Sequence, residues 1–298
     1  MKIIELLLEK VKATRYNIGF VDGSLQSVLD GKEVKVNWLK HSYKDRWFAD
    51  PFILDVTEDD IIVLVEEWYD PINRGRISKL IIDRKSYKLK TLKVMIDEGF
   101  HMSFPAITRK ADGIYIQPEC GLTRGLVEYK YDETSDSFLV GRIISELPLA
   151  DSVRTNLFGT DLMFSTKLPD ANGKELGIYE WDNTMRQYKI KNYYYFDDNI
   201  SRMAGNFFRY NNKIYRPAQV CIKSYGDAVS LQEVTLDDKG WDFEEIRRIY
   251  SPHPDYDLGF HTFNTYKDVI VVDALGYRKP VLTRILRTIK NIIKTNKQ

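Results

Sequence analysis

The chain has 298 residues, of which 44 are Lys or Arg and 43 are Asp or Glu, so its formal net charge is +1. Proteins whose main partner is nucleic acid usually carry a clear basic excess, and this balance argues against that class. Apolar residues make up 43% of the chain, charged residues 29% and aromatic residues 13%, which is typical of a soluble globular protein and excludes a disordered one.

The N-terminal stretch, residues 1–14, is predicted to form a short helix from its apolar residues between Ile3 and Val11. Acidic residues interrupt its apolar run and no cleavage site of small residues follows, so the pattern is not that of a secretory signal peptide. No apolar run approaches ~18 residues, so no transmembrane helix is expected. Cys120 and Cys221 form neither a disulfide framework nor a zinc-binding spacing. These features predict a cytoplasmic protein.

Five strand-like runs recur between residues 15 and 278, and their starting points are 52, 48, 52 and 55 residues apart: 62–67, 114–119, 162–167, 214–219 and 269–274. A shorter run precedes each of them, beginning at Pro51, Pro105, Asn156, Gly205 and His261, and four are followed by a third run, at 75–83, 126–132, 177–182 and 229–237. A unit of ~50 residues with three or four strands has the size of a propeller blade. The sequence therefore predicts an all-β, five-bladed β-propeller over residues 15–278, with a β-sandwich of accidental spacing as the alternative.

Equivalent positions of different blades converge on the axis of a propeller, which supplies candidate site residues without an alignment. The sixth position of the second strand holds Glu67, Glu119, Lys167 and Gln219 in the first four blades, and the start of the first strand holds Asp50, Phe104, Ala204 and Phe260, with His261 next. Arg202 and Arg216 occupy similar places in blade four. Such a set forms either a structural ring of ion pairs or a polar pocket for a sugar or sugar phosphate.

Several segments resemble the propeller at the N-terminus of plant glucosamine inositolphosphorylceramide transferases, and more distantly the furanosidase-type propellers of the arabinanase, xylosidase and levansucrase group. The matching segments cover roughly residues 15 to 278: 47–53, 66–67, 101–105, 116–119, 202–205, 215–219 and 259–264. The resemblance implies a carbohydrate-active protein. Related bacterial proteins are associated with surface-polysaccharide assembly, so the same setting is expected here.

The resemblance also implies roles for individual residues. Asp50 takes the place of a base or nucleophile, and Glu119 or Glu67 would be the acid that flanks the scissile bond. The expected substrate-binding residues are Arg202, Arg216, Gln219, His261, His101 and Trp47. No metal ligand set and no cofactor are predicted, although the blade-five His of such enzymes can hold a water or an ion, which leaves a divalent cation at the axis as an alternative.

Three functions remain open on this evidence. The second-blade Asp that orients the acid in the hydrolases would fall near Phe104-Pro105, where none is present, so simple hydrolysis is in doubt. Glycosyl transfer needs a base, for which Asp50 is the candidate, and cations for a phosphate leaving group, for which Arg202 and Arg216 are candidates. The first hypothesis is therefore transfer, the second a furanosidase-like glycoside hydrolase, and the third a non-catalytic glycan-binding propeller.

The C-terminal segment, residues 279–298, differs in composition from the rest of the chain. From Arg278 onward there are seven basic residues and no acidic one. On a helix the apolar residues 281, 282, 285, 286, 289, 292 and 293 fall within an arc of about 140°. This is a basic amphipathic helix, which predicts either binding to an anionic membrane surface or docking on the propeller with the charged face in water.

Overall fold

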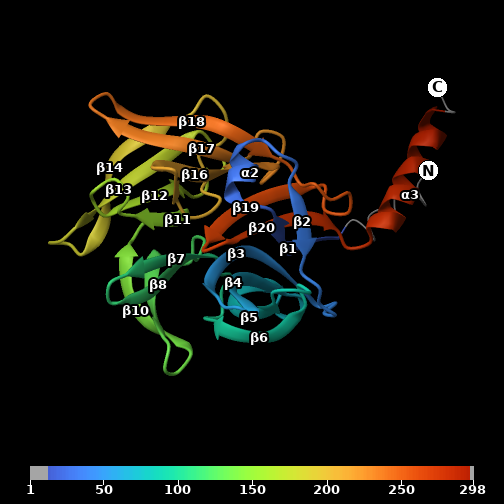
Figure 1. Cartoon of the computed structure of the whole chain (residues 1–298), viewed down its shortest axis with the longest axis horizontal. Coiled ribbons are helices and arrows are strands. Elements are labelled where there is room, and N and C mark those ends of the chain that lie inside the picture. Colours follow the sequence, from blue (N-terminus) through green and yellow to red (C-terminus); the bar gives the residue numbers. More distant parts are fainter. Residues whose placement is uncertain (1–12, 296–298) are drawn as a thin grey trace.

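The computed structural model describes residues 13–295 and contains five four-stranded antiparallel sheets arranged around a central axis (Figure 1). The predicted five-bladed β-propeller is confirmed. The helix predicted for residues 1–14 lies outside the described residues, except that Thr14 already opens strand β1.

The first three blades follow the chain, each with its innermost strand first. Blade one contains β3 (Arg46–Val56), β4 (Asp60–Tyr69), β5 (Arg74–Asp83) and β6 (Leu89–Ile96), with the 3-10 turn η1 (Asp70–Ile72) between β4 and β5. Blade two contains β7 (Ser103–Lys110), β8 (Gly113–Glu119), β9 (Leu126–Asp132) and β10 (Ser137–Ser145). Blade three contains β11 (Leu149–Thr155), β12 (Leu162–Lys167), β13 (Glu175–Asp182) and β14 (Gln187–Tyr195).

The ring is closed by strands from opposite ends of the sequence. Blade four contains β15 (Phe208–Tyr210), β16 (Lys213–Val220), β17 (Ala228–Asp237) and β18 (Gly240–Ile249). Blade five combines β19 (Gly259–Tyr266) and β20 (Val269–Tyr277) with β1 (Thr14–Asp22) and β2 (Lys35–Trp38), and the short helix α2 (Leu25–Leu29) joins the last two. The pairing of β1 with β20 runs from Thr14 opposite Tyr277 to Phe20 opposite Val271.

The five repeating runs of the sequence fall in the second strand of each blade, namely β4, β8, β12, β16 and β20. Two of the predicted innermost strands need correction. In blade three this strand is β11, which ends at Thr155, one residue before the predicted run at Asn156. In blade four β15 begins at Phe208, three residues after the predicted start at Gly205. In both blades the sequence has short apolar stretches on each side of the true boundary, and pattern alone does not separate them.

Apolar side chains fill the spaces between neighbouring blades. Phe52 of blade one meets Phe104 of blade two edge to face at 4.9 Å between ring centroids, and Phe164 of blade three lies 4.7 Å from Phe207 of blade four. The second strands are buried on both faces because each sheet is covered by a blade on either side. This packing fixes the inner strands around the axis.

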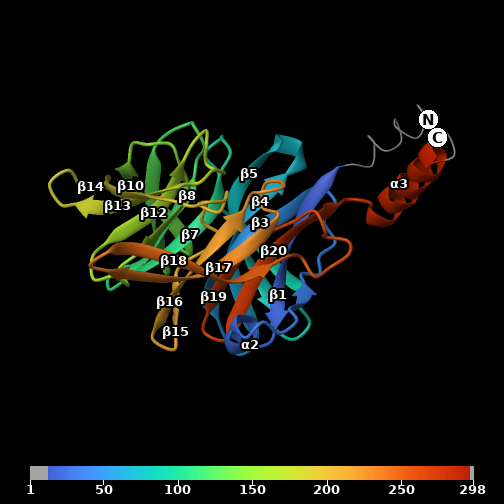
Figure 2. The ribbon, with the colours of Figure 1, turned by 90° about the horizontal axis from the view of Figure 1, so that it is seen from above.

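The helix α3 (Pro280–Thr295) follows β20 and projects away from the blades, as Figures 1 and 2 both show. Proline opens it, which suits the first helical turn because that position needs no N–H donor. In the part of the chain that the structure describes, no helix combines the length and the apolar character needed to span a membrane.

Candidate active site at the propeller axis

The innermost strands of several blades share one backbone irregularity near the axis. The register of β3, β7 and β11 shifts between residues 49 and 52, 103 and 106, and 150 and 153, which marks a bulge in each strand. The first bulged residue is Asp50, Phe104 or Asp151, with φ of 49°, 46° and 48°. Left-handed backbone is costly for residues other than glycine, at about 1 to 2 kcal/mol each, so its recurrence points to a common task.

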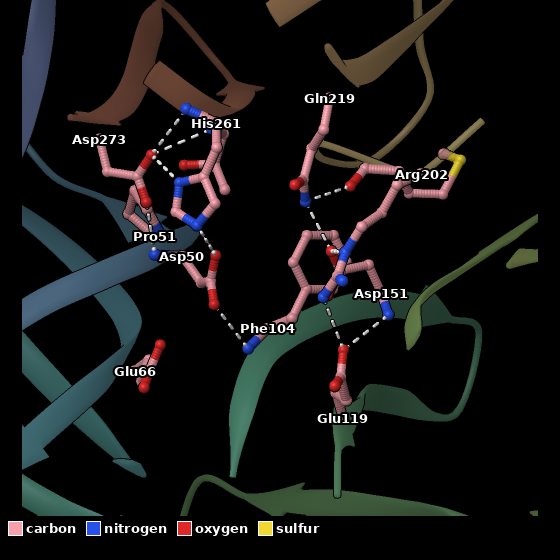
Figure 3. Close-up of polar contacts among 12 residues, drawn as sticks. Asp50, Pro51, Glu66, Phe104, Glu119, Asp151, Arg202, Gln219, His261 and Asp273 are labelled. Carbon is pink, nitrogen blue, oxygen red and sulfur yellow. Dashed lines mark hydrogen bonds and ion pairs between the residues drawn. The ribbon is translucent and has the colours of Figure 1, made fainter. Parts of the chain in front are cut away.

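That task is to direct a backbone N–H at a carboxylate of the preceding blade. The Asp50 N–H donates to Asp273 Oδ2 at 2.8 Å, and the Phe104 N–H donates to Asp50 Oδ2 at 3.1 Å. The Asp151 N–H donates to Glu119 Oε2 at 3.2 Å. Figure 3 shows the result, in which Asp50 and Glu119 lie on opposite sides of Phe104 and each is held by a neighbouring bulge.

Asp273, His261 and Asp50 form a hydrogen-bonded line. Asp273 Oδ1 accepts from the Thr262 N–H at 3.0 Å and lies 2.7 Å from His261 Nδ1, while His261 Nε2 lies 3.3 Å from Asp50 Oδ1. Burial opposes the charged form of His261, but the carboxylates of Asp273 and Asp50 outweigh it and raise the pKa of the imidazole to about 9. The ring is therefore an imidazolium at neutral pH, with one N–H directed at each carboxylate.

Asp50 is a carboxyl group poised near neutrality. Burial raises the pKa of the Asp50 carboxyl most, and the carboxylates of Asp151 and Asp273 raise it further. His261 and the Phe104 N–H lower it, and the pKa that results is about 7. A group with this pKa can take up or release a proton at physiological pH, which is what a general base requires.

Arg202 joins the carboxylates on the other side of the axis. Its Nε donates to Asp151 Oδ2 at 2.5 Å and its terminal nitrogen to Glu119 Oε2 at 3.1 Å. Gln219 Nε2 donates to the same Asp151 oxygen at 2.6 Å. Burial and the carboxylate of Asp151 raise the pKa of Glu119 to about 8, against the opposing charge of Arg202. The guanidinium is thus committed to two protein carboxyl groups.

Glu66 is the carboxyl group at the axis that is least engaged. It lies opposite Ala49 in the ladder, as Glu119 lies opposite Ser103, so Glu66 and Glu119 occupy equivalent places next to a bulge. Among the described residues, the side chain within ion-pair distance of it is His101, with Nε2 3.8 Å from Oε1, and burial lowers the pKa of that imidazole and favours its neutral form. Figure 3 shows Glu66 near Asp50 with no contact to the other residues drawn. Burial and the neighbouring carboxylates raise the pKa of Glu66 well above its usual value.

Aromatic rings line the same end of the axis. Tyr16 stacks on His261 with 4.6 Å between centroids and also contacts Trp47. Trp47 and Trp68 lie parallel at 5.4 Å, and Trp68 is next to His101 at 6.0 Å. Because cross-strand partners share a face, Trp47 and Trp68 lie on the face of blade one that carries Glu66. Such a row of half-buried rings beside carboxyl groups suits a sugar ring.

Two of the residues predicted for the site lie elsewhere. Glu67 is fully buried on the opposite face of β4, where it binds Arg46 at 2.7 Å, Arg76 at 3.0 Å and Ser78 at 2.6 Å. Arg216 is also fully buried, between the rings of Phe196 and Phe243, and it donates to the Ser201 carbonyl and to Gln232. Burial lowers the pKa of Arg216 to about 9. The other predicted residues, Asp50, Glu119, Arg202, Gln219 and His261, meet at the axis, with His101 and Trp47 at its rim.

Sequence reasoning missed Asp151, Asp273 and Glu66. The signal for Asp151 is the repeated Ala-Asp pair, which occurs at Ala49-Asp50 and again at Ala150-Asp151. Asp273 is an acidic residue within an otherwise apolar run, which is rare unless the carboxylate has partners. Glu66 is one residue away from the predicted Glu67, because the run of blade one that is equivalent to 114–119 is 61–66 and not 62–67: Glu66 pairs with Ala49 as Glu119 pairs with Ser103.

Among the described residues, one cluster has the composition of a metal site, formed by Asp50, His261 and Asp273. Both ring nitrogens of His261 already face a carboxylate, and metal ligation requires a neutral imidazole. The raised pKa of His261 therefore favours a proton in this position over a cation. Across the whole site five buried carboxyl groups (Asp50, Glu66, Glu119, Asp151 and Asp273) face two cationic side chains (Arg202 and His261).

These features define a five-bladed β-propeller with a cluster of buried carboxyl groups at its axis. Solved structures share the fold: an α-L-arabinofuranosidase from Podospora anserina in complex with cellotriose (9% identity, 83% of this chain and 82% of that one, TM-score 0.54) and a family 117 glycoside hydrolase produced by Zobellia galactanivorans (10%, 89% and 91%, TM-score 0.51). Likeness at such low identity shows the architecture.

Sequence comparison places the chain more specifically. Residues 35–254 match the family described as glucosamine inositolphosphorylceramide transferase 1, N-terminal, and the chain belongs to this family. It is 26% identical over 214 residues to a protein of that name from Arabidopsis thaliana and 24% identical over 199 residues to one from Oryza sativa subsp. japonica. These matches cover 69% and 64% of this chain but 27% of each relative, so the chain spans about a quarter of their length.

Proposed function

We propose that the chain is a carbohydrate-active enzyme of cell-surface polysaccharide or glycolipid assembly that transfers a glycosyl group at the propeller axis. The observation that carries this is the line Asp273–His261–Asp50, which holds a carboxyl group with a pKa near neutrality among buried partners. The relatives are named as transferases. Their name belongs to proteins of which this chain matches 27%, so their activity supports the proposal and does not establish it.

The charge balance at the axis bears on the donor. Arg202 is already bound by Asp151 and Glu119, and Arg216 lies away from the axis. Among the described residues Arg202 and His261 are the cationic side chains at the axis, and both already pair with protein carboxyl groups, so neither is free to bind a phosphate. The proposed donor is therefore a neutral glycoside, and a sugar phosphate or nucleotide sugar is disfavoured.

The chemistry follows from the two carboxyl groups of blade one. Asp50 accepts the proton of the acceptor hydroxyl as its oxygen forms a bond to the anomeric carbon. Glu66, whose raised pKa favours its protonated form and whose oxygens accept no bond from a described side chain beyond the distant His101, donates its proton to the departing glycosidic oxygen. Glu119 is the less suitable acid because its Oε2 already accepts from Arg202 and the Asp151 N–H.

Hydrolysis is the second candidate, because water in place of the sugar hydroxyl would react in the same arrangement and glycoside hydrolases share the fold. The two reactions are distinguished by incubating the chain with aryl glycosides, with and without sugar acceptors, and analysing the products by mass spectrometry. Transfer gives disaccharides whose yield rises with acceptor concentration. Hydrolysis gives free sugar alone.

The assay uses Asp50→Asn, Glu66→Gln and, as the control from the same strand, Glu67→Gln, with each variant checked for its fold by circular dichroism. Loss of a general acid or base lowers the rate by roughly 10²- to 10⁴-fold, so Asp50→Asn should fall by that much. Glu66→Gln should impair poor leaving groups strongly and nitrophenyl leaving groups little. Folded Glu67→Gln should keep its activity.

The proposal fails if neutral oligosaccharides raise the melting temperature of wild type and Asp50→Asn equally while no product forms, since that result identifies a glycan-binding domain. Stabilisation by nucleotide sugars alone would overturn the choice of donor.

A further inference from the structure

The C-terminal helix α3 arises at the same end of the propeller as the candidate site. The second strand of each blade runs toward that end: β8 stops at Glu119, β16 stops one residue after Gln219, and β20 carries Asp273 and stops at Tyr277. Three residues after Tyr277, α3 begins at Pro280. The helix therefore leaves the propeller at the rim of the site.

Two ion pairs fix the start of the helix to this rim. Arg278 donates to the Lys44 carbonyl and lies 2.8 Å from Asp70 Oδ2, and these two residues flank β3 and β4 of blade one next to the site. Arg284 pairs with Asp255 in the loop that leads into β19. The first contact lies just before α3 and the second uses a polar side chain of the helix, so neither involves its exposed apolar residues.

Four apolar side chains of α3 are exposed, whereas Leu286 at the edge of the same apolar arc is buried. Val281 is 62% exposed, Leu282 41%, Ile285 51% and Ile289 39%, although all four belong to residue types that are usually buried. Their spacing places them within about 100° of one another around the helix axis. Docking of this side on the propeller, the alternative left open by the sequence, is not what the structure shows (Figure 2).

Loops of the same rim add further exposed apolar side chains. Leu122 follows β8 and is 71% exposed, and Ile222 follows β16 and is 44% exposed. The site end of the propeller thus presents apolar residues from two blades as well as from the helix. The exposed apolar side chains fit a partner with an apolar interior. The seven basic residues and the absence of acidic residues from Arg278 to Gln298 fit a partner whose surface is anionic.

We propose that α3 binds an anionic lipid membrane, with its exposed apolar residues in the interface and the site end of the propeller next to the lipid headgroups. A glycan presented at this end of the propeller would be attached to a lipid, so the substrate class is a lipid-linked glycan. The assignment of substrate rests on the proposed function, whereas membrane binding does not. A helix of 16 residues has a length of about 24 Å, enough to lie along a membrane surface beside the rim.

The test is co-sedimentation of the full chain with vesicles of phosphatidylcholine alone and with vesicles in which about a third is phosphatidylglycerol. The informative variant is Ile285→Asp/Ile289→Asp, because both residues are exposed and touch no part of the site. Val140→Asp is the matched control, since Val140 is 70% exposed on the outer strand of blade two. Melting temperature and gel filtration accompany each variant.

Binding to the anionic vesicles should fall at least tenfold in the double variant, should be unchanged in the control and should weaken with salt. Equal binding to both kinds of vesicle, or an equal loss in Val140→Asp, overturns the proposal. So does a dimer of the wild type that the double variant abolishes without any vesicle binding, because the apolar side would then contact a second copy.

Activity separates this inference from the proposed function. The double variant should turn over a soluble glycoside at the wild-type rate and lose only its activity toward vesicle-bound glycolipid. If the chain binds vesicles but processes no glycan, membrane binding by α3 is supported and the proposed reaction is wrong.

Discussion

Raising the pH should destabilise the protein through Asp50, and the size of the effect can be estimated. The folded pKa of Asp50 is about 7, whereas its ordinary value is 3.8, so the folded state binds more protons than the unfolded state between these values. Stability from this group is present at acidic pH and is lost as pH rises through 7. From about pH 5 to about pH 8 the loss is about 3 kcal/mol, at 1.36 kcal/mol per pKa unit.

The assay is thermal unfolding of wild type and Asp50→Asn across this pH range. The variant lacks the titrating group, so its advantage over wild type should grow by about 3 kcal/mol, or about 6 °C in melting temperature for a chain of this size. In wild type His261 contributes in the same direction, because its folded pKa of about 9 lies above the ordinary 6.5 and its stabilisation is lost as pH rises toward 9. Asp50→Asn removes one of the carboxylates that raise this pKa, so the variant loses less from His261 and the difference between the proteins widens further. Parallel curves for the two proteins would refute the assignment of a raised pKa to Asp50.

Three further predictions concern the residues around the site. Arg202→Gln leaves Asp151 and Glu119 without their cation and should cost about 3 to 5 kcal/mol at neutral pH, measured by urea unfolding, with a smaller loss in acid. Gly75→Ala places a Cβ 2.4 Å from Glu66 Oε1 and 2.7 Å from the Met102 carbonyl, so it should cost about 1 to 3 kcal/mol and reduce activity, whereas Gly173→Ala should be mild in both assays. Trp68→Ala removes a ring from the rim and should raise KM for oligosaccharides several-fold with kcat nearly unchanged; an unchanged KM would exclude stacking on Trp68.

The repeat of the fold could be predicted because each second strand is a compact apolar run, and runs such as 114–119 and 269–274 recur at nearly constant spacing. The inner strand of blade three could not be placed from the sequence. It contains Asp151 and Ser152 at its bulge, which interrupt the apolar pattern, while the apolar residues after Asn156 imitate a strand.

The site was predicted in part for the same reason. Asp50, Glu119, Arg202, Gln219 and His261 could be gathered from equivalent positions, since a propeller brings such positions to its axis. Glu66 and Glu67 could not be told apart, because a strand alternates its side chains between faces and the apolar run of blade one can be aligned with that of blade two in two ways, one residue apart. The burial of Arg216 between two rings depends on Phe196 and Phe243, which come from distant strands.

The pairing of β1 with β20 has a consequence for the order of folding. Thr14 pairs with Tyr277, so β1 and β2 stay without their sheet until the chain as far as Tyr277 has left the ribosome. Contacts between such distant segments form late, because the intervening loop must first be closed. Tyr16 lies on β1, the strand that pairs late, and its ring stacks on His261. Blades one to four can therefore assemble before the ring of Tyr16 covers His261. The site at the axis should therefore be complete only after β1 has paired with β20.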